Sequence, residues 1–258
     1  MERIDCDVLV IGWGKAGKSL ARAQGLAGRH VVMVEQSDQM YGGTCINIAC
    51  VPTKALVHRA GLRRDDDPPA PWFTDAAGVD IDERGFVRVD ERLRTSAEGV
   101  FAVGDVNGGP QFTYVSYDDH RIVLDQLAGS GTRRTTDRVA VPTTTFLTPP
   151  LSRVGLSETE ARERGLDVHV VSKPVAAIAA MPRPKIVGET HGLIKFVVDA
   201  KSRMVLGAVL FCVDSQELVN LVALAMRAGV RADQLRDGIW THPSSTESMN
   251  EVLAALPR

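Results

Sequence analysis

A glycine-rich turn between two apolar segments near the N-terminus constrains the fold of this chain more than any other feature. Residues 7–11 (DVLVI) have the pattern of a buried strand, and Gly12, Gly14 and Gly17 follow them as G-x-G-x-x-G. The next stretch has helical spacing, and residues 30–35 (HVVMVE) have the pattern of a second buried strand. This order predicts a right-handed βαβ unit with parallel strands, and therefore an α/β fold.

The spacing of the turn is typical of dinucleotide binding. Gly12 permits a tight turn, Gly14 permits the backbone to approach a pyrophosphate, and Gly17 permits close packing of helix on strand. Glu35 ends the second strand, 21 residues after Gly14, where its carboxylate can accept hydrogen bonds from a ribose. The alternative is a glycine-rich turn that binds nothing, and the motif alone does not distinguish FAD from NAD.

Two cysteines lie five positions apart in GGTCINIACVPTK, and three interpretations compete for them. Zinc needs about four ligands, and Cys45 and Cys50 have no second pair, because Cys6 and Cys212 each stand alone. Two ordinary buried thiols are the second interpretation. A redox-active disulfide is favoured, because the pair begins an expected helix whose dipole, with Lys54, stabilises a thiolate. We expect no metal site.

The middle of the chain changes character. Residues 62–72 (LRRDDDPPAPW) are charged and then proline-rich, which indicates a linker or junction. Residues 85–105 give strand-like segments that end in a buried strand and turn, and residues 114–129 predict a helix closed by Gly129. The polar stretch 130–142 marks a boundary, so we divide the chain into domains 1–138 and 139–258.

The last part predicts an antiparallel sheet covered by helices. Capping boxes are expected at Ser157 with Glu160 and at Asp214 with Glu217, and Gly229 is expected to end the second helix. The strand candidates are TTTFLT, DVHVVSK, GLIKFVVD and RMVLGAVLFCV.

Composition excludes several classes of partner. The net charge of −2 and the pI near 6.3 argue against nucleic acid or an anionic membrane. No stretch reaches the ~18 apolar residues of a transmembrane helix, and the N-terminus lacks signal-peptide features. We therefore expect a cytoplasmic protein, where a close cysteine pair is more often catalytic or metal-binding than structural.

Together, VIGWGKAG, GGTCINIACVPTK, FAVGDV and THPSSTES resemble the class I pyridine nucleotide-disulfide oxidoreductases. These are flavoenzymes such as dihydrolipoamide dehydrogenase, glutathione reductase and mercuric reductase. The resemblance is strongest to the reactive-chlorine-resistance branch, the hypothiocyanous acid reductases, through MYGGTCINIACVPTKALVH, GGPQFTYVSYDDHRIV and TPPLSRVGLSETEARERG. No cysteines follow Glu247, which disfavours mercuric reductase.

The resemblance implies a homodimeric flavoprotein with a truncated, doubly wound FAD-binding Rossmann-type domain followed by an α+β dimerisation domain. Cys50 would face the flavin, Cys45 would attack the substrate, and His242, oriented by Glu247, would act as acid/base from the other subunit. Lys54 would belong to the same catalytic group. FAD would be held by Gly12, Gly14, Lys15, Ala16, Gly17, Glu35, Gln36, Gly43, Thr44, Gly104 and Asp105. Read without the family, His242 is more simply an exposed loop histidine.

The chain departs from the family in one respect. Family members carry a second glycine fingerprint for NAD(P)H, but this sequence has one, and residues 61–74 stand where the NAD(P)H domain would be. Two functions therefore compete. The first is a FAD-dependent reductase of a small oxidant or disulfide, with lipoamide or a metal ion as alternative substrates. The second is a non-catalytic, dimerising remnant.

We also expect His58 and His120 to be surface or helix-packing residues, and Tyr114 and Tyr117 to pack in a core.

Overall fold

The computed structural model describes residues 4–43 and 78–257. The chain forms two compact units, Met1–Asp137 and Arg138–Arg258. Each unit is described separately.

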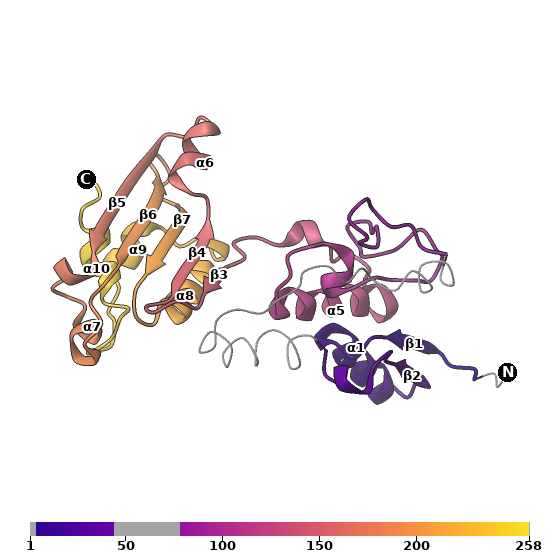
Figure 1. The fold of residues 1–258 in the computed structure, drawn as a ribbon. Helices are drawn as coiled ribbons and strands as arrows, with labels where there is room; N and C mark the ends of the chain where they lie inside the picture. The colour runs from indigo at the N-terminus through magenta and orange to yellow at the C-terminus, as the bar shows by residue number, and fades with distance from the viewer. Residues whose placement is uncertain (1–3, 44–77, 258) are drawn as a thin grey trace. The chain divides into compact units, whose positions relative to one another are not determined.

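The first unit begins with the expected βαβ element (Figure 1). Strands β1 (Val8–Ile11) and β2 (Val31–Val34) pair in parallel, in a register from Val8↔Val31 to Ile11↔Val34. Helix α1 (Lys15–Leu26) connects them. The predicted parallel arrangement is confirmed.

The small sheet is covered unevenly. Helix α1 buries a face that includes Ala16, Gly17 and Leu20. In β1, Val10 is buried, whereas Leu9 and Ile11 are 55% and 51% exposed. Because alternate side chains of a strand point to opposite faces, one face of β1 has no cover among the described residues.

The remainder of this unit is one long helix and a set of turns. Helix α5 (Thr113–Ala128) ends at Gly129, as predicted, and packs on α1; short 3₁₀ turns occupy Asp38–Met40 (η1), Gly104–Asn107 (η2) and Thr135–Asp137 (η3).

The strands expected within residues 85–105 do not form, and that prediction is wrong. Only isolated bridges occur there, such as Arg94↔Phe101. The Asp90 carboxylate accepts hydrogen bonds from the backbone N–H groups of Arg92 and Arg94 at 2.8 and 2.9 Å. Such aspartate turns satisfy the backbone locally and so compete with a sheet ladder.

The second unit contains a five-stranded antiparallel sheet in the order β3-β4-β7-β6-β5 (Figure 1). The pairing is antiparallel throughout, as predicted, and includes Leu193↔Phe211 between β6 and β7. The strands are β3 (Thr143–Thr145), β4 (Leu151–Gly155), β5 (Val168–Pro174), β6 (Leu193–Asp199) and β7 (Val205–Phe211).

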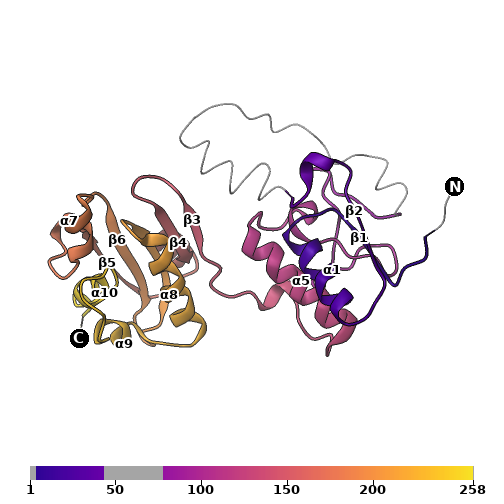
Figure 2. The ribbon, with the colours of Figure 1, turned by 90° about the horizontal axis from the view of Figure 1, so that it is seen from below.

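Helices cover the sheet and close its core (Figure 2). Ile194, Phe196 and Leu210 project from one face of the sheet and are at most 1% exposed. They share a cluster with apolar side chains of α8, α9 and α10. The helices are α6 (Glu158–Glu163), α7 (Pro182–Val187), α8 (Ser215–Arg227), α9 (Ala232–Arg236) and α10 (Ser248–Leu253), with a 3₁₀ turn at Val175–Ala177.

One predicted capping box is present and the other is not. Ser157 and Glu160 exchange both capping hydrogen bonds at the start of α6. Asp214 precedes α8 with φ +62°, and its side chain makes no capping bond. A capping side chain needs an extended backbone, so the predicted box with Glu217 is wrong. Gly229 follows the end of α8, as expected, with φ +69°.

Strand β4 was missing from the predicted set. Its sequence, LSRVG, places a serine on the core side, where an apolar residue is expected. Ser152 is fully buried and its hydroxyl lies 2.8 Å from that of Thr144 and 2.9 Å from that of Ser215. This hydroxyl chain lets a polar side chain occupy a core position.

None of the described helices combines the length and the apolar character needed to cross a bilayer.

Candidate active site

The glycine turn of the first unit has open space in front of it. Gly12 has φ +94°, and a Cβ added at Gly12 or Gly14 would meet no atom within 4 Å. A Cβ on Gly17 would instead lie 2.7 Å from the Gly12 carbonyl oxygen. The first two glycines therefore leave room for a ligand, and the third allows α1 to pack closely on the turn.

The start of α1 offers donors to that space. Gly14 precedes the helix and no side chain caps it. The first N–H groups of a helix have no intrahelical acceptors and attract anions. Lys15 and Ala16 are the first two residues of this helix, and the Ala16 side chain is buried.

Glu35 is joined directly to the glycine turn. Its Oε2 accepts a hydrogen bond of 2.9 Å from the Trp13 N–H, and its Oε1 accepts one of 2.9 Å from the Gln36 N–H. Oε1 also accepts from the Ser37 N–H at 3.4 Å, so the further lone pair of Oε2 is the one left for a ribose hydroxyl. The acid thus stabilises the turn, a role that the sequence did not predict.

Gly43 brings the segment before the cysteine pair to the same place. It has φ +77°, and an added Cβ would lie 2.5 Å from the Gly14 Cα. Only a residue without a side chain permits this backbone approach. Gly43 precedes Cys45 by two positions in the sequence.

Helix α5 connects the second expected cofactor element to the first. The buried Asp119 carboxylate accepts hydrogen bonds from the Gly104 N–H at 2.6 Å and from Asn107 Nδ2 at 3.3 Å. On the same helix, the Tyr117 ring lies 4.9 Å from Lys15 Nζ at the start of α1. The helix therefore contacts both the Gly104–Asn107 turn and the glycine-turn region.

Asp105, the acidic residue of the Gly104–Asn107 turn, has a carboxyl group with a raised pKa. Burial raises the pKa of Asp105, and the nearby Asp119 carboxylate raises it further. Asp119 was not predicted as a site residue. The available signal was an acidic side chain at a position of α5 that faces inward, since Asp119 is 1% exposed.

The expectations for Tyr114 and His120 have different outcomes. Tyr114 is 46% exposed and stacks on Phe112, so its assignment to a core is wrong. His120 is buried, and desolvation lowers its pKa, with opposition from a contact to the Tyr117 carbonyl. It is a helix-packing residue, as expected.

Thr44, Cys45, Cys50, Lys54 and His58 lie outside the described residues. Of the other two cysteines, Cys6 is partly exposed and Cys212 is fully buried. Burial, reinforced by the Asp214 carboxylate, raises the pKa of the Cys212 thiol to about 12. Cys212 is therefore a thiol rather than a thiolate at neutral pH. Among the described residues, no cluster of three or more His, Cys, Asp or Glu side chains could hold a metal ion.

The second unit brings His242 and Glu247 together. His242 Nδ1 lies 2.9 Å from Glu247 Oε1, and the Ser244 N–H donates to Glu247 Oε2 at 2.8 Å. These two contacts, the Ser244 N–H first, lower the pKa of Glu247. The histidine side chain is 71% exposed and the glutamate side chain 15%. An ionised Glu247 holds the Nδ1–H tautomer, so Nε2 is free to exchange a proton.

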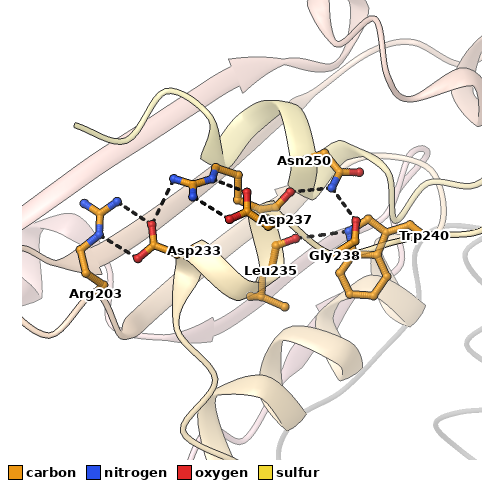
Figure 3. A network of polar contacts seen from close by, with 8 residues as sticks. Arg203, Asp233, Leu235, Asp237, Gly238, Trp240 and Asn250 are labelled. Atoms are coloured by element: carbon orange, nitrogen blue, oxygen red, sulfur yellow. Dashed lines mark hydrogen bonds and ion pairs between the residues drawn. The ribbon is translucent and has the colours of Figure 1, made fainter. Parts of the chain in front are cut away.

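A polar network anchors the segment that leads to His242 (Figure 3). Asn250 Nδ2 donates to the carbonyl oxygens of Arg236 and Gly238 at 2.6 and 2.9 Å, and Trp240 Nε1 donates to that of Leu235 at 3.3 Å. The start of α9 is fixed by Asp233, which pairs with Arg203 at 2.9 Å. The network ties the backbone before His242 to α9 and α10.

The residues present fit a dinucleotide such as FAD. The fit rests on the open space at Gly12 and Gly14, the uncapped start of α1 and the carboxylate of Glu35 beside it.

Comparison with known proteins identifies the family. The model of the pyridine nucleotide-disulphide oxidoreductase dimerisation domain matches residues 141–253, and that of pyridine nucleotide-disulphide oxidoreductase matches residues 61–119. A curated relative, the probable pyridine nucleotide-disulfide oxidoreductase RclA of Escherichia coli K12, is 52% identical over 180 residues, which are 70% of this chain and 40% of RclA.

A second curated relative is less similar in sequence. Dihydrolipoyl dehydrogenase of Mycobacterium bovis is 34% identical over 182 residues, which are 70% of this chain and 39% of that enzyme. The chain thus spans about 40% of the length of the curated relatives it matches.

Solved structures show the same fold. The HOCl-induced flavoprotein disulfide reductase RclA from Escherichia coli matches with a TM-score of 0.90 and 29% identity, over 97% of this chain and 100% of that one. LpdA from Mycobacterium tuberculosis matches with a TM-score of 0.65 and 20% identity, over 98% of this chain and 62% of that one, which supports the fold alone. The chain belongs to the pyridine nucleotide-disulphide oxidoreductase family.

Proposed function

We propose that this chain is a FAD-binding, homodimeric disulfide oxidoreductase that reduces a small oxidant or disulfide through Cys45 and Cys50. The observation that carries the proposal is the exposed His242, held at Nδ1 by the largely buried Glu247. A histidine with one nitrogen fixed and the other open to solvent is suited to acid/base work. The relatives that are disulfide reductases support the same reaction class.

In the proposed reaction, the Cys45 thiolate attacks the electrophilic sulfur of the substrate, and His242 Nε2 protonates the group that leaves. Cys50 then attacks Cys45, so that a Cys45–Cys50 disulfide forms and the second leaving group departs with the remaining electron pair. For hypothiocyanous acid, the two leaving groups are water and thiocyanate. FAD, when bound and reduced by two electrons, would supply the two electrons that return the pair to the dithiol form.

The chain's own residues have defined tasks at the cofactor. Gly12 and Gly14 would leave room for the pyrophosphate, the start of α1 would donate N–H groups to it, and Glu35 would accept from the ribose. Gly104 and Asp105 would meet the flavin side of the cofactor. Lys15, Ala16, Gly17, Gln36, Gly43 and Thr44 complete the proposed cofactor set, and Lys54 the catalytic one.

For the substrate, we propose a reactive-chlorine-type oxidant such as hypothiocyanous acid. The identity of 52% with RclA and the description of the solved RclA as HOCl-induced support this class. Lipoamide and a metal ion are alternative substrates.

A second function is favoured by a specific observation. The sequence has a single dinucleotide fingerprint, and Leu9 and Ile11 leave one face of β1 exposed among the described residues. Both features fit a remnant that dimerises without turning over NAD(P)H.

The absorbance spectrum of the purified protein distinguishes the two functions. We expect a flavin spectrum that dithionite reduces by two electrons, and a long-wavelength thiolate–flavin band without reductant in Cys45→Ser. Cys50→Ser should lack this band, and Cys6→Ser, a lone cysteine, is the matched control. A protein without flavin would overturn the proposal, and flavin that NADPH leaves oxidised would show that electrons need another donor.

A further inference from the structure

The loop that carries His242 and Glu247 has an anchor beyond the network of Figure 3. Ser245 lies between the two residues and is 4% exposed. Its hydroxyl donates a 2.8 Å hydrogen bond to Asp214 Oδ2. Asp214 lies 31 positions earlier in the chain, directly before α8, so this bond joins two distant segments of the unit.

Asp214 is itself held in place. Arg183 Nε, on α7, lies 3.4 Å from the same carboxylate oxygen. The backbone of Asp214 has φ +62°, a conformation that is uncommon for a residue other than glycine. Such a conformation persists where surrounding contacts impose it. Here it directs the carboxylate away from the start of α8 and toward Ser245.

The hydrogen bond between Ser245 and Asp214 is linked to His242 through Ser244 and Glu247. The neighbouring residue, Ser244, donates its N–H to Glu247 Oε2, and Glu247 Oε1 contacts His242 Nδ1. Fixing the Ser245 side chain therefore fixes the direction of the Ser244 N–H, and with it the orientation of the carboxylate.

We propose that Asp214 is a positioning residue, which acts through Ser245 to hold Glu247 in the orientation that fixes the His242 tautomer. This inference rests on the proposed acid/base role of His242. Arg183 contributes by neutralising the carboxylate, although a partly exposed ion pair of this kind adds little stability by itself.

The test is an NMR titration of the purified chain with ¹³C-labelled Asp and Glu carboxyl groups. In Ser245→Ala and Asp214→Gly, we expect the pKa of Glu247 to rise toward its ordinary value, because the Ser244 N–H is no longer directed at it. Glycine adopts the backbone conformation of Asp214 without strain, so Asp214→Gly should preserve the start of α8. Imidazole ¹⁵N shifts of His242 should change from a single Nδ1–H tautomer to a mixture.

Conservative variants and controls separate positioning from general loosening. Ser245→Thr keeps a hydroxyl and Asp214→Asn keeps an acceptor oxygen, so both should retain the wild-type values. Ser202→Ala is the matched control, because it removes a 2.6 Å hydroxyl–carboxylate bond to Asp199 at the opposite end of the β6–β7 hairpin. The pKa of Asp233, lowered by Arg203, should stay unchanged in every variant.

An unmoved Glu247 in both Ser245→Ala and Asp214→Gly would overturn the proposal, as would a parallel shift of Asp233. The titration does not depend on flavin. A chain that lacks flavin but shows the Glu247 shift would defeat the proposed function alone. A flavin-loaded chain without the shift would defeat the positioning role alone.

Discussion

At the scale of the residue, the glycines of the first turn have separable tasks. A Cβ added to Gly14, whose φ of −73° suits any residue, would meet no atom within 4 Å. A Cβ added to Gly17 would lie 2.7 Å from the Gly12 carbonyl oxygen. Gly14 therefore leaves room for the proposed ligand, whereas Gly17 serves the fold. The sequence pattern predicted both positions but not this division, because it does not contain the distances between the turn and the helix.

Gly14→Ala should fold as the wild type and lose flavin. The added methyl group would occupy the open space that the pyrophosphate needs. We expect an unchanged melting temperature of the flavin-free protein and at least about tenfold weaker FAD binding, equivalent to ~1.4 kcal/mol, in a fluorescence titration.

Gly17→Ala is the companion variant. It should lower the melting temperature, because the contact with the Gly12 carbonyl forces α1 away from the turn. Wild-type FAD affinity in Gly14→Ala would show that the turn does not hold the cofactor.

At the scale of the element, the antiparallel sheet depends on close backbone contacts. A Cβ on Gly207, in β7, would lie 1.9 Å from the Leu156 carbonyl oxygen, beyond the end of β4. Backbone cannot rotate away as a side chain can. The tight contact thus fixes where the chain leaves the sheet toward α6.

Gly207→Ala should destabilise the second unit by more than a Gly165→Ala control, at or above the upper end of the about 1–3 kcal/mol that overpacking usually costs. Gly165→Ala is the control, because φ there is +69° but no atom lies within 4 Å of an added Cβ. It should cost only backbone strain, roughly 1–2 kcal/mol. Urea unfolding would measure both, and equal losses would contradict the importance of the Leu156 contact.

Sequence patterns predicted the regular elements best where a local signal and the tertiary structure agree. Ser157 and Glu160 begin α6 through contacts within one turn, so their spacing was sufficient. Asp214 failed as a cap because Ser245, far along the chain, holds its carboxylate. The 85–105 segment failed because Asp90 satisfies backbone groups that a strand would have paired.

At the scale of the whole molecule, ionised carboxylates unite distant parts of the second unit. Lys195 lowers the pKa of Glu158, chiefly through a side-chain hydrogen bond, and Arg203 does the same for Asp233. The Glu158 pair joins α6 to β6, and the Asp233 pair joins α9 to the turn between β6 and β7, whereas Glu247 holds His242 within their shared loop. The pKa values of Glu158, Asp233 and Glu247 are all lower than the ordinary values of these carboxyl groups.

The stability of the second unit should therefore fall with acid. A carboxylate with a depressed folded pKa stabilises the fold above its unfolded pKa of about 4, and this stabilisation is lost as pH falls through the folded value. Thermal unfolding followed by circular dichroism between pH 6 and pH 3 should show the loss. Asp233→Asn should be less stable at pH 6 and have a smaller pH dependence, whereas an unchanged slope would contradict the role of this pair.

Because the thiol of Cys212 is buried, its chemical labelling can report when the second unit unfolds. The side chain is fully enclosed and its pKa is about 12, so an alkylating reagent meets almost no thiolate in the native state. Once the core separates, the thiol regains an ordinary pKa and reacts. The rate at which mass spectrometry finds Cys212 labelled thus measures how often this unit unfolds, whatever the oxidation state of Cys45 and Cys50.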